Sequence, residues 1–183
     1  MYAKRSVSTR IAKYLFVVII FMGIISSLSL LVMASNKSDA EAINISGSLR
    51  MQSYRLLTEM ERSPDTVEQN LVRYQDSLNA HVLLTVQNQL FAPPGIKASY
   101  QKILQRWAVM SDFARAHQIE KYHAELKSYV QDVDDFVLEL QRFAEKKWII
   151  AVSVLCISML LILAMVSYRS EEHTSELQSR ITI

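Results

Sequence analysis

One arginine occupies a position where an apolar side chain is expected. Between Asp39 and Leu57 the chain reads DAEAINISGSLRMQSYRLL, and residues three and four apart there fall on one face of a predicted helix. This face is called the Arg50 stripe, and its members are Ala40, Ile43, Gly47, Arg50, Tyr54 and Leu57. All of them except Arg50 suit the buried line of a helix pair. The stripe therefore places a permanent positive charge one helical turn from a glycine.

A guanidinium in such a position is suited to binding a small planar anion. Its paired N–H donors lie in a rigid plane, which fits a flat oxyanion better than a lysine ammonium does. Gly47 leaves room one turn away and lets a ligand approach the backbone. If two copies paired in parallel, two Arg50 groups ~6 Å apart would repel by about 3 kcal/mol at an effective dielectric of about 20. One anion ~4 Å from each guanidinium would attract each by about 4 kcal/mol at the same dielectric, so the stripe predicts a dimer that closes around negative charge.

The spacing of the stripe leaves a ligand-free alternative open. An arginine stem can lie along apolar surface while its charged head stays in water. The head can also pair with a carboxylate nearby in the chain, and Asp39, Glu59 and Glu61 are available.

Two long apolar segments flank the stripe. Residues 14–34 and 148–168 contain no charged side chain, and a helix of that length spans about 31 Å, which matches a hydrocarbon core of about 30 Å. Tyr14, Trp148 and Tyr168 stand at their ends, where amphipathic rings favour the membrane interface. The first segment follows a basic start, as a secretory signal does, but it exceeds the usual signal core, so we expect an uncleaved anchor.

The charges beside these segments predict how the chain crosses the membrane. The first thirteen residues carry only basic charges, which keeps the N-terminus cytoplasmic. The charges beside the second apolar segment are less decisive. Three basic residues lie before it, on the side predicted to be periplasmic: Arg142, Lys146 and Lys147. The predicted order is a cytoplasmic tail 1–13, a first span 14–34, a periplasmic domain 35–147, a second span 148–168 and a cytoplasmic stub 169–183.

The predicted periplasmic domain has the composition of a soluble helical domain. The whole chain of 183 residues contains only 3 Gly and 3 Pro, so few residues can break a helix. A first helix is expected to continue to about Arg62, and Ser63 and Pro64 are expected to cap and start the next. The apolar face of that short second helix is expected to be Val67, Leu71, Tyr74 and Leu78. A third helix covers 96–113, outlined by Ile96, Tyr100, Ile103, Trp107, Met110 and Phe113. A fourth covers 119–143, where apolar residues alternate three and four apart. The stretch AHVLLTVQNQLFAPPG is the least regular.

These patterns predict an all-α protein, a membrane-anchored antiparallel four-helix bundle with two transmembrane helices. The first helix carries a second apolar line, formed by Ile45, Leu49, Leu56 and Met60. That line can face the chain's own bundle, which leaves the Arg50 stripe free for a second copy. The predicted assembly is therefore a parallel homodimer through the first helix.

Several functions are not supported by the sequence. A net charge of +2 without a basic-aromatic patch argues against a nucleic-acid partner. His81, His117 and His123 lack metal-ligand spacing, and Cys156 has no second cysteine to pair with. No glycine-rich phosphate loop and no nucleophile–base pair is present. We therefore expect no catalytic residue, no metal and no cofactor in this chain.

The stretch DAEAINISGSLRMQSYRL closely resembles the periplasmic ligand-binding box of the nitrate/nitrite sensor histidine kinases of the NarX/NarQ type. The resemblance runs from about Lys4 to Arg169 and is also strong in YVQDVDDFVLELQRFAEKK. It implies a homodimeric sensor of a two-component phosphorelay in the bacterial inner membrane. In such a sensor Arg50 and Gly47 would bind nitrate, and nitrite more weakly, at the dimer axis. The positions expected to support them are Ile43, Ser46, Met51 and Tyr54.

The resemblance also implies parts that this sequence does not show. Kinases of that family carry a relay segment, a phosphorylated histidine and an ATP-binding domain after the second span, and reach response regulators only through them. The stretch SEEHTSELQSRITI looks like translated sequencing-adaptor DNA, so we expect the native protein to continue past about Arg169. Two other interpretations stay open: the input domain of a chemotaxis or type IV pilus methyl-accepting transducer, and a structural membrane bundle without a ligand.

Overall fold

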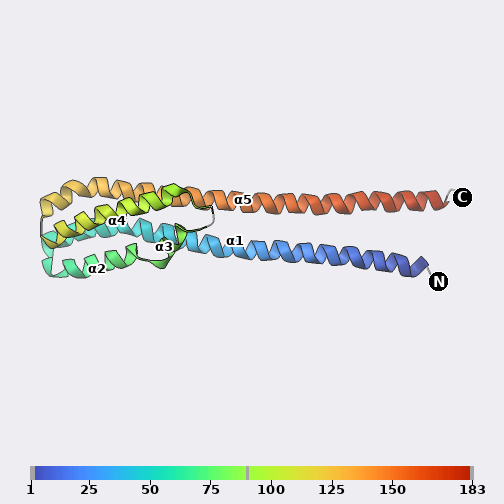
Figure 1. Cartoon of the computed structure of the whole chain (residues 1–183), viewed down its shortest axis with the longest axis horizontal. Helices are drawn as coiled ribbons and strands as arrows, with labels where there is room; N and C mark the ends of the chain where they lie inside the picture. The colour runs from blue at the N-terminus through green and yellow to red at the C-terminus, as the bar shows by residue number, and fades with distance from the viewer. Residues whose placement is uncertain (1–2, 90, 182–183) are drawn as a thin grey trace. The chain divides into compact units, whose positions relative to one another are not determined.

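Every regular element of the described chain is helical, which confirms the predicted all-α class. The computed structural model describes residues 3–89 and 91–181. The elements, shown in Figure 1, are α1 (Ala3–Arg62), a short 3-10 helix η1 (Pro64–Thr66), α2 (Val67–Leu78), α3 (His81–Val86), α4 (Pro94–Arg115) and α5 (Ile119–Ile181). The chain divides into two compact units, Met1–Ala34 with Lys147–Ile183, and Ser35–Lys146. The unit Ser35–Lys146 is called the sensor unit.

The first unit consists of the outer parts of α1 and α5. Both helices are long and apolar enough to cross a membrane. Their large apolar side chains are uncovered, as Leu30 and Met33 on α1 and Leu160 on α5 illustrate. Two serines among them bond inside the helix, where the hydroxyls of Ser27 and Ser29 donate to the carbonyls of Gly23 and Ile25. Such internal bonding is what a helix needs in lipid.

Proline residues set where the helices of the sensor unit begin. α1 ends at Arg62 as predicted, and Pro64 opens η1, where a missing N–H costs nothing. Ser63 stands at the predicted cap position, but its side chain makes no capping hydrogen bond there. Pro94 opens α4 in the same way after Pro93 in an extended conformation. The helices run antiparallel because short turns join neighbours.

The core of the sensor unit is formed by the predicted apolar faces. The buried residues of α2 are those predicted for it, Val67, Leu71, Tyr74 and Leu78. Those of the α5 part are Tyr122, Leu126, Tyr129, Val130, Asp132, Val133, Phe136, Val137, Leu140 and Phe143. α4 contributes the predicted Ile96, Tyr100, Ile103, Trp107 and Met110, whereas Phe113 is only half-buried. The three-and-four periodicity therefore identified the inward faces correctly.

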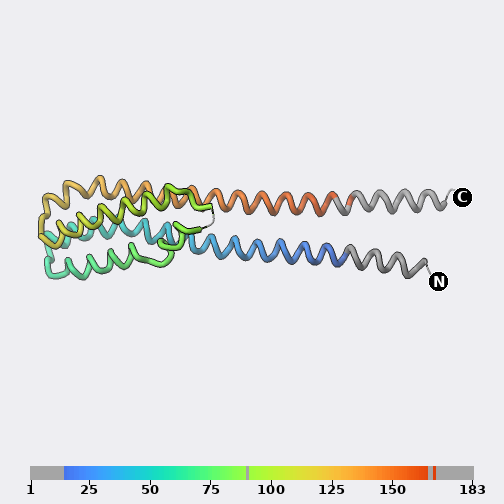
Figure 2. The backbone as a smooth tube through the Cα atoms, viewed as in Figure 1, coloured from blue at the N-terminus to red at the C-terminus, as the bar shows by residue number. Residues whose placement is uncertain are grey.

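The stretch that the sequence marked as irregular contains one short helix, α3. Val82, Leu83 and Val86 are buried, so this turn covers one end of the bundle core. A short apolar run has no clear helical period, which is why the pattern did not predict it. Figure 2 shows that the chain passes from α3 to α4 at the end of the sensor unit where α1 enters and α5 leaves.

Candidate anion-binding site

The Arg50 stripe lies on the side of α1 that its own bundle leaves open. Ala40, Arg50 and Tyr54 are exposed, and Ile43, Gly47 and Leu57 are half-buried. The buried line of the same helix is Ala42, Ser46, Leu49, Ser53, Leu56 and Met60. Leu49, Leu56 and Met60 thus face the chain's own bundle as predicted, and Ile45 is half-buried. Among the described residues of the sensor unit, none covers the stripe completely, so Ala40, Arg50 and Tyr54 stay exposed.

The Arg50 side chain has two partners in the structure. Its Nη1 lies 2.6 Å from Oδ1 of Asp134 on α5, and its Nε donates to the carbonyl of Gly47 at 3.3 Å. A Cβ added at Gly47 would meet Nη2 of Arg50 at 3.5 Å, an ordinary contact distance. Gly47 is therefore packed under the guanidinium, and its helical conformation does not itself require glycine.

The Arg50–Asp134 ion pair is partly open to water. The two side chains retain 45% and 39% of their exposure, and a pair in such a setting contributes about 0–1 kcal/mol. Breaking a buried ion pair is costly because it leaves a charge without water, but both charges of this pair stay in contact with water. Breaking the Arg50–Asp134 pair therefore costs little free energy.

The other predicted site residues are divided between two sides of α1. Met51 and Tyr54 are 66% and 51% exposed beside Arg50, and Ile43 is half-buried on the same stripe. Ser46 is fully buried, and its hydroxyl donates to the carbonyl of Ala42 at 2.8 Å. Ser46 thus faces the bundle core and not the open side, because it is one residue out of step with the stripe.

The carboxylate that pairs with Arg50 is none of the three that the sequence suggested. Asp39 is buried, Glu61 is exposed, and Glu59 bonds to Arg55 and Asn70. A signal for Asp134 was available, since Arg50 and Asp134 lie at nearly equal numbers of residues from the predicted span ends at 34 and 148. In two continuous antiparallel helices, two residues that are equally far in sequence from the span ends lie at the same height along the helices, because each residue adds about 1.5 Å.

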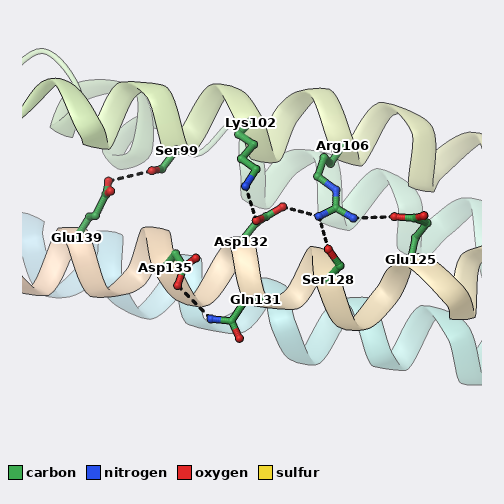
Figure 3. A network of polar contacts seen from close by, with 9 residues as sticks. All are labelled: Ser99, Lys102, Arg106, Glu125, Ser128, Gln131, Asp132, Asp135 and Glu139. Atoms are coloured by element: carbon green, nitrogen blue, oxygen red, sulfur yellow. Dashed lines mark hydrogen bonds and ion pairs between the residues drawn. The ribbon is translucent and has the colours of Figure 1, made fainter.

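A polar network fixes α5 to α4 (Figure 3). The Asp132 carboxylate lies 2.7 Å from Lys102 Nζ and 2.5 Å from Arg106 Nη1. Arg106 also donates to Glu125 at 2.8 Å and to Ser128 at 2.9 Å. Burial of the Asp132 carboxyl raises its pKa, but the hydrogen bonds and charges of Lys102 and Arg106 outweigh this, and the pKa is lowered. Asp132 thus holds α4 while Asp134, two residues on, reaches α1.

A second network joins α1 to the rest of the core one turn beyond Arg50. The Tyr122 hydroxyl donates to the carbonyl of Ser53 at 3.0 Å, and the Ser53 hydroxyl lies 3.3 Å from that of Tyr74. The hydroxyls of Tyr74 and Tyr129 are 2.8 Å apart, and the Trp107 ring stacks on Tyr74 with centroids 3.6 Å apart. Residues of α1, α2, α4 and α5 meet here, so α1 cannot slide without disturbing this cluster.

The chain belongs to a known family of input domains. Residues 31–129 match the family described as the type IV pili methyl-accepting chemotaxis transducer N-terminal domain, PilJ. Two curated relatives carry sensor names. One is a "Sensor protein NarQ homolog" of Haemophilus influenzae, 64% identical over 168 residues, which covers 92% of this chain and 30% of that protein. The other is the "Nitrate/nitrite sensor protein NarQ" of Escherichia coli, 34% identical over 154 residues, covering 84% of this chain and 27% of that protein.

These findings confirm the resemblance that the box around Arg50 predicted. The match to the Haemophilus influenzae protein covers 92% of this chain and so extends well beyond the box. The chain spans less than a third of either relative's length.

Proposed function

We propose that this chain is the sensing module of a nitrate/nitrite sensor kinase, and that one nitrate binds between the Arg50 side chains of two copies. The observation that carries the proposal is the position of Arg50, an arginine 45% exposed in the middle of an open stripe of a bundle helix. The planar donor set of the guanidinium fits nitrate. Similarity to the Escherichia coli protein that is named a nitrate/nitrite sensor supports the choice of anion.

In this proposal the Arg50–Asp134 pair is the anion-free arrangement. Nitrate takes the Asp134 position on Arg50, which removes one contact between α5 and α1 and draws two copies of α1 together. Gly47 leaves space beneath the guanidinium, and Ile43 and Tyr54 pack beside it across the two-fold axis. Nitrate biases the equilibrium only by its different affinity for the two arrangements, and a few kcal/mol is sufficient.

We further propose that this change crosses the bacterial inner membrane through α1 and α5. Residues 14–34 and 148–168 would form the spans, residues 35–147 would be periplasmic, and both termini would be cytoplasmic. A shift of α1 against α5 would then reach the cytoplasmic end of the second span. In the whole protein it would set the activity of a kinase toward its response regulators.

Calorimetry with the full chain in phosphatidylcholine nanodiscs tests the anion site. Nitrate should bind the unmodified chain, and Arg50→Ala should abolish the heat of binding. Arg55→Ala is the matched control, because Arg55 is an exposed arginine of the same helix that pairs only with Glu59 among the contacts described. Arg50→Lys keeps the charge but loses the planar donors, so it should bind weakly. Undiminished nitrate affinity in Arg50→Ala would refute the site.

A second candidate function is the input domain of a chemotaxis or type IV pilus transducer, which the family match favours. The two candidates share the sensor unit and differ in the output domain attached beyond the second span. The gene sequence past the codon for Arg169 distinguishes them, since one predicts a kinase core and the other a long methylated coiled coil.

A further inference from the structure

Arg50 holds a carboxylate with only part of its guanidinium. Its Nη1 lies 2.6 Å from Oδ1 of Asp134, and its Nε donates to the carbonyl of Gly47 at 3.3 Å. No residue in the described part of the chain accepts a hydrogen bond from Nη2. A guanidinium can hold both oxygens of one carboxylate through two parallel N–H···O bonds. Arg50 therefore makes one of these two bonds and leaves the other unmade.

The attachment of Asp134 to α5 restricts how its carboxylate approaches Arg50. Asp132, two residues earlier, ties this part of α5 to α4 through ion pairs with Lys102 and Arg106. Among the contacts described, only Oδ1 of Asp134 bonds to Arg50. A carboxylate that is free in solution has no such restriction and can turn to accept from Nη1 and Nη2 together. It thus gains a hydrogen bond that Asp134 does not make.

Two other arginines of the sensor unit offer a solute less than Arg50 does. Arg55 pairs with Glu59, whose side chain is only 15% exposed and also accepts a hydrogen bond from Asn70. Arg106 is 23% exposed, and both of its Nη atoms bond to carboxylates of α5. In the Arg50 pair the two side chains keep 45% and 39% of their exposure. A small anion in water can therefore reach the guanidinium of Arg50 and the bond that it leaves unmade.

We propose that the Arg50 site also binds small carboxylates, of which formate is the smallest. Formate is planar and singly charged, as nitrate is, and its two oxygens match the donors Nη1 and Nη2. Gly47 leaves the side of Nη2 uncovered, since a Cβ added there would lie 3.5 Å from that atom. Formate and nitrate then compete for one site, and formate lowers the occupancy by nitrate. The inference rests on the proposed anion site at Arg50.

Competition calorimetry with the full chain in phosphatidylcholine nanodiscs tests the inference, with sodium formate as the probe. Formate titrated alone should bind with the same stoichiometry as nitrate. At about ten times its own Kd, formate should then raise the apparent Kd of nitrate about tenfold, which is the factor that simple competition gives. Sodium chloride keeps the ionic strength equal in every titration, so that the screening of charge does not differ between them.

Variants of the two arginines separate the possible outcomes. Arg50→Ala changes an exposed side chain and leaves the core intact, and it should abolish formate binding, whereas Arg55→Ala should retain it. If nitrate binds and formate neither binds nor competes, the carboxylate inference is wrong and the proposed function is untouched. If neither anion binds to the unmodified chain, both fail together. Formate binding that survives in Arg50→Ala would place the carboxylate elsewhere and overturn the inference.

Discussion

Arg50 on α1 and Asp134 on α5 form an ion pair of 2.6 Å across 84 residues of sequence. Both helices of this pair continue into the predicted spans, so the contact joins the two elements through which a signal could leave the sensor unit. It is also partly exposed, at 45% and 39% of the two side chains. An anion that competes for Arg50 therefore acts directly on the link between α1 and α5.

Removing the competing carboxylate should tighten nitrate binding. Asp134→Asn leaves Arg50 without its ion-pair partner, and loss of a partly exposed pair worth up to about 1 kcal/mol should lower the nitrate Kd by about two- to fivefold. Asp135→Asn is the control, because Asp135 is an exposed neighbour that bonds only to Gln131 among the contacts described. Calorimetry on both variants measures the effect. Equal Kd values for Asp134→Asn and Asp135→Asn would show that Asp134 does not compete with the anion.

The tyrosine cluster beside Ser53 should contribute measurably to stability. Tyr129→Phe removes the hydrogen bond to Tyr74 inside the core, which should lower the free energy of unfolding by about 1 kcal/mol. Tyr54→Phe makes the same chemical change at a side chain that is 51% exposed and should leave stability unchanged. Urea unfolding followed by circular dichroism compares the two. Equal losses in both variants would contradict the assigned role of the cluster.

Stability should fall at alkaline pH because burial raises the pKa values of Tyr74, Tyr122 and Tyr129. In the unfolded chain these phenols ionise near pH 10, so above that pH the unfolded state releases protons that the native state keeps. Each buried phenol should then reduce the free energy of unfolding by about 1.4 kcal/mol per pH unit, and the stabilisation is fully present below pH ~10. Urea unfolding between pH 9 and 11 measures the slope.

Tyr122→Phe supplies the control for that slope. The variant has one buried phenol fewer, so its stability should decline less steeply with pH even if it starts lower. An unchanged slope would mean that Tyr122 ionises at its ordinary pKa in the folded chain.

A glycine at position 117 should stabilise the sensor unit. His117 has a φ of 53° two residues after the end of α4, where Gln118 N–H donates to the Phe113 carbonyl at 2.8 Å. This left-handed position strongly favours glycine, so His117→Gly should raise the free energy of unfolding by about 1 kcal/mol. Ala116→Gly places the same residue at a φ of −78° and should not stabilise. A gain in both variants, or in neither, would contradict the strain assigned to His117.

Periodicity predicted the helices of this protein well and its contacts unevenly. The alternation from Tyr122 to Phe143 fixes which side of α5 faces inward, because apolar side chains must leave water. The same alternation does not reveal that Ser46 lies on the buried side of α1 with Leu49 and not on the open side with Gly47. A polar residue is not expected in a core, but a buried serine can donate its hydroxyl to a carbonyl of the preceding turn. Nor does local spacing reveal Asp134, which becomes a neighbour of Arg50 only when two helices far apart in sequence align.

The short connection between α3 and α4 marks a different limit of sequence patterns. The run that forms α3 is too short for its period to separate helix from strand, and the pattern gives no sign that Phe91, which follows it, is 85% exposed. Phe91 also has a left-handed φ of 69°, which is uncommon for a bulky residue. Such features arise from tertiary geometry and not from residue type.

The stoichiometry of nitrate binding tests the central claim most directly. Two Arg50 side chains on one anion require one nitrate per two chains, with no binding in Arg50→Ala, when the full chain in nanodiscs is titrated by calorimetry. Perchlorate, a tetrahedral anion of the same charge, should bind more weakly than nitrate. One nitrate per chain, or binding that survives Arg50→Ala, would contradict an anion held between paired arginines.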